Sequence, residues 1–170
     1  FLSEHPCFVG GLSRSQPQVR GTLEPYDLMI VLGADVLRMS VWDAVDPMPA
    51  DLPIVQIGLN DWEMGKNYAT EIAIGSDVRE TLKALTPALK ERGGSVLSDA
   101  AAKRIMALAS KNWSANRATL IEKIETTGSG EPINPDWLML QISEALPENG
   151  IIVNEGVTAA RYLNDIHPYR

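Results

Sequence analysis

The chain has 170 residues, 45% of them hydrophobic, and a formal net charge of −7. Its length corresponds to one domain or slightly more, and its apolar content excludes a chain that is disordered throughout. The acidic balance without a Lys/Arg cluster excludes a nucleic-acid-binding surface, and no apolar run approaches the roughly 20 residues that span a membrane.

The chain contains a single cysteine, Cys7, which excludes an internal disulfide and a cysteine metal site. A reducing, cytoplasmic compartment is therefore expected. The acidic residues do not cluster with ligand spacing, so no metal site is predicted. Cys7 and the tryptophans are expected to be buried. Because the first residue is Phe1 and the last residues follow closely on an apparent strand and helix, we expect a piece of a longer polypeptide.

Three apolar segments in the first half each end in glycine. A short helix is predicted over 18–24, closed by Pro25, and the first strand over 27–34. Its uninterrupted apolar run is typical of a strand buried on both faces of a parallel sheet. Further strands are predicted over 53–58 and 70–75. The spacing indicates an α/β fold with an open parallel sheet and flanking helices.

Helical signals follow the second and third strands. Asn60 is predicted to cap a short turn of helix, and Ser76 to cap a longer one with Asp77 in its first turn. Pro87 should kink this longer helix, and the Gly pair at 93–94 should end it. Residues 98–125 are predicted to form one long helix or two shorter ones, followed by linker chemistry over 126–130.

The last 40 residues begin with a sharp helix start, where Asn134 caps a helix and proline takes its first position. A buried strand is predicted over 150–153, then a polar turn over 154–158 and a helix to Asn164. This order indicates the start of a second α/β unit. The predicted limits are a middle domain over 1–94, a helical linker over 95–131 and the opening of a further domain over 132–170.

Four segments together resemble one enzyme family. Residues 5–10 (HPCFVG) are similar to the His-Pro-x-x-x-Gly segment in the middle domain of thiamine-diphosphate-dependent decarboxylases and synthases. Residues 26–34 resemble a strand of that domain, 57–68 its Gly-Lys-Asn segment, and 134–158 the opening of the pyrophosphate-binding domain. Benzoylformate decarboxylases and acetolactate synthases are the nearest types.

The resemblance implies a Rossmann-like, nucleotide-binding-type middle domain of six parallel strands, without its first third here. It implies a parent enzyme that decarboxylates a small 2-keto acid, or transfers the product to an acceptor, with thiamine diphosphate and Mg²⁺. Such parents are homodimers or homotetramers, because the cofactor lies between subunits. The family's cofactor-activating glutamate and Mg²⁺ motif are not among these residues, so no catalytic residue is assigned and the chain alone is expected to be inactive.

The turn at 154–158 carries the candidate cofactor-binding residues. A hydroxyl and backbone N–H groups before a helix suit a diphosphate, although residue types alone favour Thr158 as a simple helix cap. The resemblance implies that Thr158 contacts the cofactor diphosphate, with help from Gly156 and Val157. Glu155 is assigned no chemistry.

Gly33, Ala34 and Arg38 could form a nucleotide crevice at the strand ends. Two departures from the synthases argue against FAD. Asp35 and Val36 occupy the neighbourhood of their FAD-contacting Arg, and residues 59–60 replace the acidic residue after the second strand. We therefore favour a structural middle domain without FAD. The alternative is a stand-alone domain that binds FAD or ADP, or serves as a scaffold.

Overall fold

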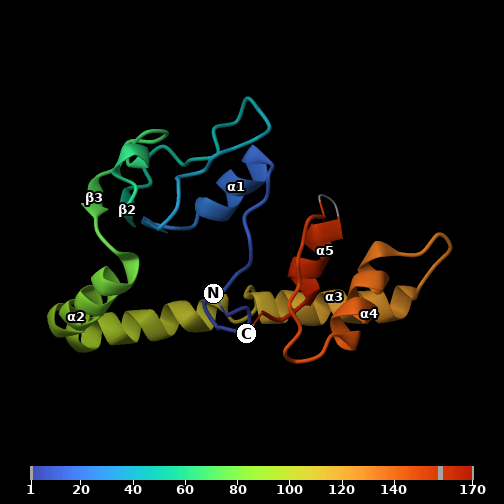
Figure 1. The fold of residues 1–170 in the computed structure, drawn as a ribbon. Coiled ribbons are helices and arrows are strands. Elements are labelled where there is room, and N and C mark those ends of the chain that lie inside the picture. Colours follow the sequence, from blue (N-terminus) through green and yellow to red (C-terminus); the bar gives the residue numbers. More distant parts are fainter. Residues whose placement is uncertain (1, 157–158, 170) are drawn as a thin grey trace. The chain divides into compact units, whose positions relative to one another are not determined.

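The computed structural model describes residues 2–156 and 159–169. The chain forms two compact units, one of Gly11–Ser98 and one of Phe1–Gly10 with Asp99–Arg170. Figure 1 shows the elements in chain order. They are α1 (Gln16–Leu23), β1 (Met29–Leu32), β2 (Ile54–Gly58), the 3₁₀ turn η1 (Asp61–Glu63), β3 (Ile72–Gly75), α2 (Val78–Leu108), α3 (Trp113–Thr127), α4 (Pro135–Ala145) and α5 (Ala159–Ile166).

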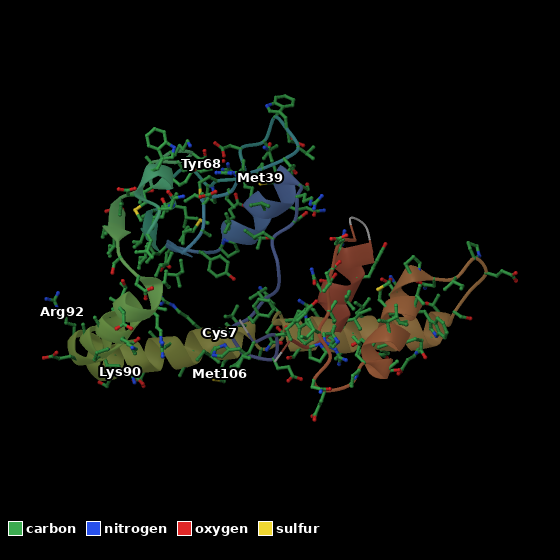
Figure 2. The ribbon with its side chains drawn as sticks, in the orientation of Figure 1. Cys7, Met39, Tyr68, Lys90, Arg92 and Met106 are labelled. Atoms are coloured by element: carbon green, nitrogen blue, oxygen red, sulfur yellow. The ribbon has the colours of Figure 1, made fainter. Side chains whose placement is uncertain are left out.

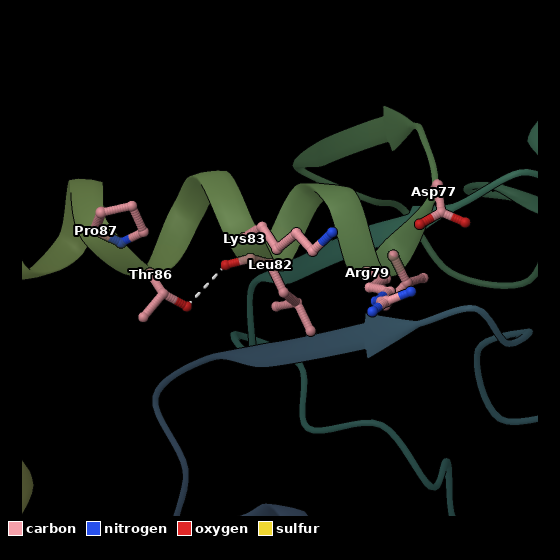
Figure 3. Close-up of a pocket in the computed structure, with 7 residues that line it drawn as sticks. Asp77, Arg79, Leu82, Lys83, Thr86 and Pro87 are labelled. Carbon is pink, nitrogen blue, oxygen red and sulfur yellow. Dashed lines mark hydrogen bonds between the residues drawn. The ribbon is translucent and has the colours of Figure 1, made fainter.

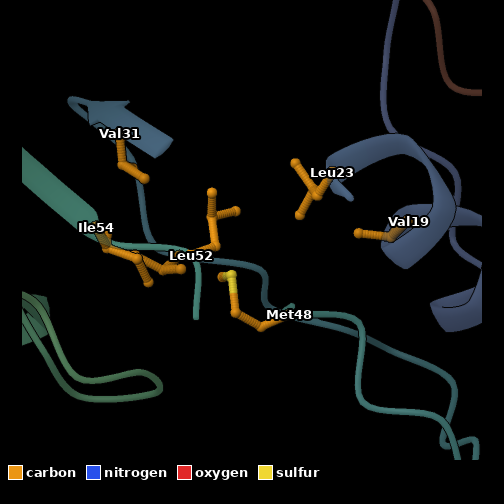
Figure 4. Packing of buried hydrophobic residues seen from close by; sticks show 7 residues of the cluster. Val19, Leu23, Val31, Met48, Leu52 and Ile54 are labelled. Carbon is orange, nitrogen blue, oxygen red and sulfur yellow. The ribbon is translucent and has the colours of Figure 1, made fainter. Parts of the chain in front are cut away.

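The Gly11–Ser98 unit is built on a parallel sheet in the order β1-β2-β3. All three strands lie within the predicted ranges, which confirms the open α/β sheet with flanking helices. One face of the sheet is covered by α1 and by the loop that joins β1 to β2 (Figure 4). The buried cluster there consists of Val19, Leu23, Val31, Val36, Met48, Leu52 and Ile54. Arg20 secures this loop, since its Nη1 donates to the carbonyl oxygens of Asp46 and Met48.

The opposite face of the sheet is also apolar but is only partly covered. In register, Ile30, Val55 and Ile72 share this face with Leu32, Ile57 and Ile74. Ile57 is buried, whereas Ile30 is 50% exposed and Ile72 is 51% exposed. The prediction that the first strand is buried on both faces is therefore wrong. Burial on both faces needs a layer on each side of the sheet, and the described residues provide a complete layer on one side only.

Helix α2 is capped by Asp77 and not, as predicted, by Ser76. The Asp77 Oδ1 accepts a hydrogen bond from the Glu80 N–H at 3.0 Å. Ser76 still belongs to the end of the sheet, since its N–H donates to the carbonyl oxygen of Gly58 at 2.9 Å. An N-cap residue must leave the strand before its side chain can reach the helix amides, and Asp77 is the first residue to do so.

Replacing Asp77 by alanine should lower the free energy of unfolding by about 1 kcal/mol, because the first turn of α2 loses its side-chain acceptor. Urea denaturation followed by circular dichroism measures this change. Ser76→Ala is the matched control and should be close to neutral. Equal losses for the two variants would contradict the assignment of the cap to Asp77.

Asn60 precedes η1 but makes no side-chain capping hydrogen bond, so its predicted capping role is wrong. The later helix boundaries agree with the sequence. The backbone of α2 leaves helical geometry at Gly94, where φ is 52°, and a helical backbone then continues to Leu108. The glycine pair predicted to end the helix therefore interrupts it. The predicted helical stretch after it divides in two, and Asn112 caps the second part by accepting from the Ala115 N–H at 2.9 Å. Asn134 caps α4 through the Asp136 N–H at 2.9 Å, as predicted.

The second unit packs α3, α4 and α5 around Ile124, Leu140 and Ile166. The predicted strand at 150–153 is not formed, and Ile151 is 90% exposed. A strand of this type is stable only beside a hydrogen-bonded neighbour, and the described part of this unit contains no strand. The domain limits drawn from the sequence remain a prediction.

Several side chains expected in the core lie at the surface. Trp42 is 84% exposed and Trp62 is 76% exposed. Cys7, which is labelled in Figure 2, is also exposed. Trp113 does follow the expectation: it is buried, and its Nε1 donates to the carbonyl oxygen of Asn164 at 3.0 Å. Residue type therefore predicted burial correctly only where a packed element lies opposite.

Candidate functional site

A crevice lies where the parallel strands β1 and β2 reach their carboxyl ends, against the start of α2. Its volume is about 330 Å³. The lining residues come from the two loops that follow the strands and from the first residues of α2: Gly33, Ala34, Asp35, Gln56, Ile57, Gly58, Leu59, Asn60, Glu63, Met64, Asp77 and Val78. This is the edge of an open α/β sheet where ligands are usually bound.

Gln56 holds the loops of the crevice together. It is 3% exposed although it lies in the middle of an apolar strand. Its Nε2 donates to the Ala34 carbonyl oxygen at 3.3 Å, and its Oε1 accepts from the Gly65 N–H at 3.1 Å and from the Thr70 hydroxyl at 3.4 Å. Gln56 was not among the predicted site residues, although a glutamine within an Ile-Val-Gln-Ile strand is the signal that could have found it.

The cations beside the crevice are paired with its acidic residues. Arg38 contacts Asp35 at 2.7 Å and Glu63 at 3.1 Å, and Lys66 contacts the other oxygen of Glu63 at 3.1 Å. The hydrogen bond from Lys66, together with the charges of Lys66 and Arg38, holds the pKa of the Glu63 carboxyl below its ordinary value despite partial desolvation. Arg38, predicted as a possible nucleotide contact, is therefore occupied by carboxylates of the chain itself.

The N-terminus of α2, which faces the crevice, is already occupied by the carboxylate of Asp77. Asp77 lines the crevice and accepts from the first turn of α2, where a bound phosphate would otherwise sit. Asp35 and Glu63 add two more carboxylates to the lining. An anionic dinucleotide would meet these three groups, so the arrangement disfavours a diphosphate at this edge.

A second groove runs along α2, with a volume of about 820 Å³ (Figure 3). Leu82 points from α2 toward the sheet, and the Thr86 hydroxyl donates to the Leu82 carbonyl oxygen at 2.8 Å. The groove is lined by residues of the first turns of α2 and by Asp77, with both charge signs among them. It brings together no group of side chains suited to catalysis.

The candidate cofactor turn is described only in its first part. Val157 and Thr158 lie outside the described residues. The N–H of Gly156 donates to Oδ1 of Asn154 at 3.0 Å, which shapes the turn, and α5 begins at Ala159. The turn thus precedes a helix, as predicted, but no strand precedes it. Sequence reasoning missed the role of Asn154, although an Asn two residues before a glycine is a known turn signal.

Side chains from α3 and α4 fix the position of α5. Nε of Arg117 donates to the Ile166 carbonyl oxygen at 2.6 Å, and the Ser143 hydroxyl lies 2.9 Å from Nδ1 of His167. The Trp113 indole adds the contact with Asn164 described above. The helix after the candidate turn is therefore held at its carboxyl-terminal end.

Asp165 has an unfavourable charge in this unit. Partial desolvation and the nearby charge of Asp136 raise the pKa of its carboxyl above the ordinary value of 3.8, while Arg161 acts in the opposite direction. The residue as a whole is exposed, so solvent weakens these effects. One oxygen of Asp136 is itself buried without a hydrogen-bond partner among the described residues. The direction of this pKa shift means that the folded state favours the neutral form of Asp165 slightly over the ionised form.

We expect Asp165→Asn to raise the melting temperature at neutral pH. Because the folded-state pKa is raised, the advantage of the folded state is present below pH 3.8 and is lost as pH rises through the folded pKa. The variant should therefore match the parent below that range and exceed it above. Thermal melts across pH 3 to 7 measure the difference, and a constant offset at every pH would contradict the electrostatic cause.

Within residues 2–156 and 159–169, no group of three or more His, Cys, Asp or Glu could hold a metal ion. No helix in the described part of the chain is long and apolar enough to cross a membrane. The geometry thus leaves two features of interest, the acidic crevice and the turn before α5.

Residues 1–85, half of the chain, match the model of a protein family described as "Thiamine pyrophosphate enzyme, central domain". The chain belongs to the thiamine pyrophosphate enzyme family. It is also 29% identical over 111 residues to a benzoylformate decarboxylase of Pseudomonas aeruginosa, an alignment that covers 55% of this chain and 21% of that relative. The chain thus spans about a fifth of the length of this curated relative. No solved structure matches.

The match confirms the resemblance of residues 5–68 to the middle domain of the family and agrees with the parallel sheet of Gly11–Ser98. The resemblance of residues 134–158 to a pyrophosphate-binding domain stays a prediction. The family implies thiamine diphosphate as the cofactor of its enzymes. The central-domain match ends at residue 85, within α2, so the turn before α5 lies outside the matched region.

Proposed function

We propose that these residues belong to a thiamine-diphosphate-dependent 2-keto-acid decarboxylase or carboligase. The observation that carries the proposal is the match of residues 1–85 to the central domain of the family. The similarity to a benzoylformate decarboxylase supports decarboxylation of a 2-keto acid as the reaction type. The chain itself contributes structure and part of the cofactor site, and without the rest of the enzyme it is inactive.

The sheet unit serves a structural role in this proposal and does not bind FAD. Its crevice presents Asp35, Glu63 and Asp77, and the neighbouring Arg38 and Lys66 are paired with the first two. A dinucleotide needs backbone N–H groups or free cations for its diphosphate. Here the helix N-terminus is capped by Asp77, so such a ligand would have to displace a carboxylate of the chain.

The turn before α5 is the proposed cofactor contact, with Gly156, Val157 and Thr158 as the binding residues. The described part of the turn suits an anion, because it is exposed, has no side chain at Gly156 and precedes a helix. The Gly156 N–H donates to Oδ1 of Asn154, which shapes the turn, so a diphosphate that uses this N–H would replace Asn154 as its acceptor. When bound, thiamine diphosphate supplies the electron sink for decarboxylation, and the protein supplies position and electrostatics.

The Mg²⁺ site, the substrate and the oligomeric state belong to the whole enzyme. Mg²⁺ would be held by residues elsewhere in the longer polypeptide, since no ligand cluster occurs in the described part of this chain. The enzyme would be a cytoplasmic homodimer or homotetramer with a small 2-keto acid as substrate. Residues 95–131 would link the middle domain to a pyrophosphate-binding domain that opens at 132.

The test uses the complete reading frame that contains these residues. Expressed with thiamine diphosphate and Mg²⁺, it should release CO₂ from at least one of a panel of 2-keto acids, benzoylformate among them, and the 170-residue chain should release none. Thr158→Ala in the complete enzyme should raise the thiamine diphosphate concentration needed for half-maximal activity, and Glu155→Gln should not. A complete enzyme that turns over no 2-keto acid would remove the proposed reaction, and equal responses of the two variants would remove the site.

The competing function is a nucleotide-binding domain, favoured only by the position of the crevice at the carboxyl edge of the sheet. Isothermal calorimetry of the chain with FAD and with ADP separates the two. Tight binding of either, abolished by filling the crevice with Gly58→Leu, would establish the nucleotide site.

A further inference from the structure

The turn between α4 and the candidate cofactor segment contains an asparagine unlike the others in the chain. Of eight asparagines, six make a side-chain hydrogen bond that constrains them. These six are Asn67, Asn112, Asn116, Asn134, Asn154 and Asn164. Asn60 has no side-chain cap hydrogen bond, and Asn149 makes no side-chain hydrogen bond to another described residue.

Asn149 is also the only asparagine followed by glycine. In the other seven cases the next residue has a side chain, which shields the peptide nitrogen between the two residues. The turn itself requires glycine at 150, because a Cβ there would lie 2.9 Å from the Pro147 carbonyl oxygen and 3.4 Å from the Pro147 ring. The exposed, unconstrained amide is thus placed beside the least hindered nitrogen of any asparagine in the chain.

We propose that Asn149 is a site of spontaneous deamidation. The Gly150 nitrogen loses its proton and attacks Cγ of Asn149, the new C–N bond closes a five-membered imide, and ammonia leaves with the former side-chain nitrogen. Water then opens the imide at either carbonyl and gives aspartate or isoaspartate. The net change is the exchange of an amide for a carboxyl group with water as the only co-reactant, and no oxidation occurs.

The turn controls how fast this happens. The Gly150 N–H donates to the Pro147 carbonyl oxygen at 2.8 Å, so the nitrogen must leave this bond before it can attack. The surrounding residues 147–151 are exposed or half-exposed and lie outside any helix or strand, and such connections open readily. The reaction is therefore slower in the folded chain than in the unfolded chain but does not require global unfolding.

Deamidation adds a negative charge to the segment between α4 and the candidate cofactor turn, which already carries a glutamate. Asn149 lies between Glu148 and Glu155, and the new carboxylate would precede the turn at Asn154 and Gly156 by a few residues. If the turn binds the cofactor as proposed, the added negative charge weakens the binding of a diphosphate. Isoaspartate also adds one atom to the backbone between α4 and the turn. The deamidation itself does not depend on the proposed function.

The test is peptide mass mapping of the whole chain during incubation at mildly alkaline pH and body temperature. We expect the peptide that contains Asn149 to acquire the mass of the acid first, with isoaspartate as the major product, while the peptides of the six hydrogen-bonded asparagines keep the amide. In urea the conversion at Asn149 should accelerate. Conversion at another asparagine before Asn149, or a stable Asn149 in both folded and unfolded chain, would overturn the proposal.

Asn149→Gln is the control, because its longer side chain closes the corresponding imide far more slowly. It should remove the modification and leave the circular dichroism spectrum unchanged. In the complete enzyme, the deamidated form and the Asn149→Asp variant would be compared for thiamine diphosphate binding. If these forms bind thiamine diphosphate as tightly as the unmodified enzyme, the effect on the cofactor is ruled out. Whether Asn149 deamidates is decided by the mass map alone.

Discussion

Replacing Gln56 by leucine should lower the free energy of unfolding of the sheet unit by about 2–4 kcal/mol. Gln56 is buried, and its amide serves the Ala34 carbonyl, the Gly65 N–H and the Thr70 hydroxyl. Leucine fills a similar volume but leaves these groups without their partner, and each buried polar group left unpaired costs about 1–3 kcal/mol. The urea midpoint of the chain should fall with an unchanged slope.

The matched control is Gln141→Leu on α4, where the glutamine is exposed and its Nε2 donates to the exposed carboxylate of Glu144 at 3.4 Å. Its effect should stay within about 0.5 kcal/mol, as for most surface substitutions. If both variants had the same small effect, the three hydrogen bonds of Gln56 would not hold the crevice loops together.

The elements that depend on local signals could be predicted from the sequence. The three strands with glycine exits, the Asn134 cap and the break at Gly94 all lie where the residues indicate. Each depends on a few neighbouring residues: an apolar run, a side-chain acceptor before a proline, or a glycine that can adopt positive φ. Such signals are largely independent of how the rest of the chain packs.

The predictions that were wrong depend on contacts between residues that are distant in the sequence. Whether Ile30 or Trp62 is buried depends on what lies opposite, which no local pattern records. Residues 150–153 have the composition of a strand but need a neighbouring strand, and none lies beside them in the described part of their unit. Ser76 and Asp77 both suit a helix cap, and the choice between them was decided by the hydrogen bond of Ser76 to Gly58 across the sheet.

The candidate site was predictable to a similar degree. The polar turn before α5 and the doubtful nucleotide role of Arg38 came from residue types and a resemblance to the family. The structure explains why Arg38 is unsuited to a nucleotide: its guanidinium is paired with two carboxylates of the chain. It also added Asn154 as the residue that shapes the turn. The ion pair of Arg38 with Glu63 cannot be derived from sequence spacing, because it joins residues from different loops. The contact of Asn154 with Gly156 is local, and its signal is present in the sequence.

Replacing Ile124 by alanine should destabilise the second unit by about 2–5 kcal/mol. Ile124 is 2% exposed at the centre of the cluster it forms with Leu140 of α4 and Ile166 of α5. Truncation to alanine leaves a cavity that three helices would have to close together, and hydrogen bonds to α5 from Trp113 and Arg117 limit how far that helix can move.

Ile142→Ala on α4 deletes the same atoms from a side chain that is 40% exposed, and its loss should be clearly smaller. Urea denaturation monitored by tryptophan fluorescence would follow this unit once Trp42 and Trp62 of the sheet unit are replaced by phenylalanine, since the remaining Trp113 and Trp137 pack within the second unit. The Ile124 variant should also speed amide hydrogen exchange in α5, because its anchor Ile166 loses a packing partner. Unchanged exchange in α5 would mean that its hydrogen bonds, and not the shared core, hold the helix beside the candidate cofactor turn.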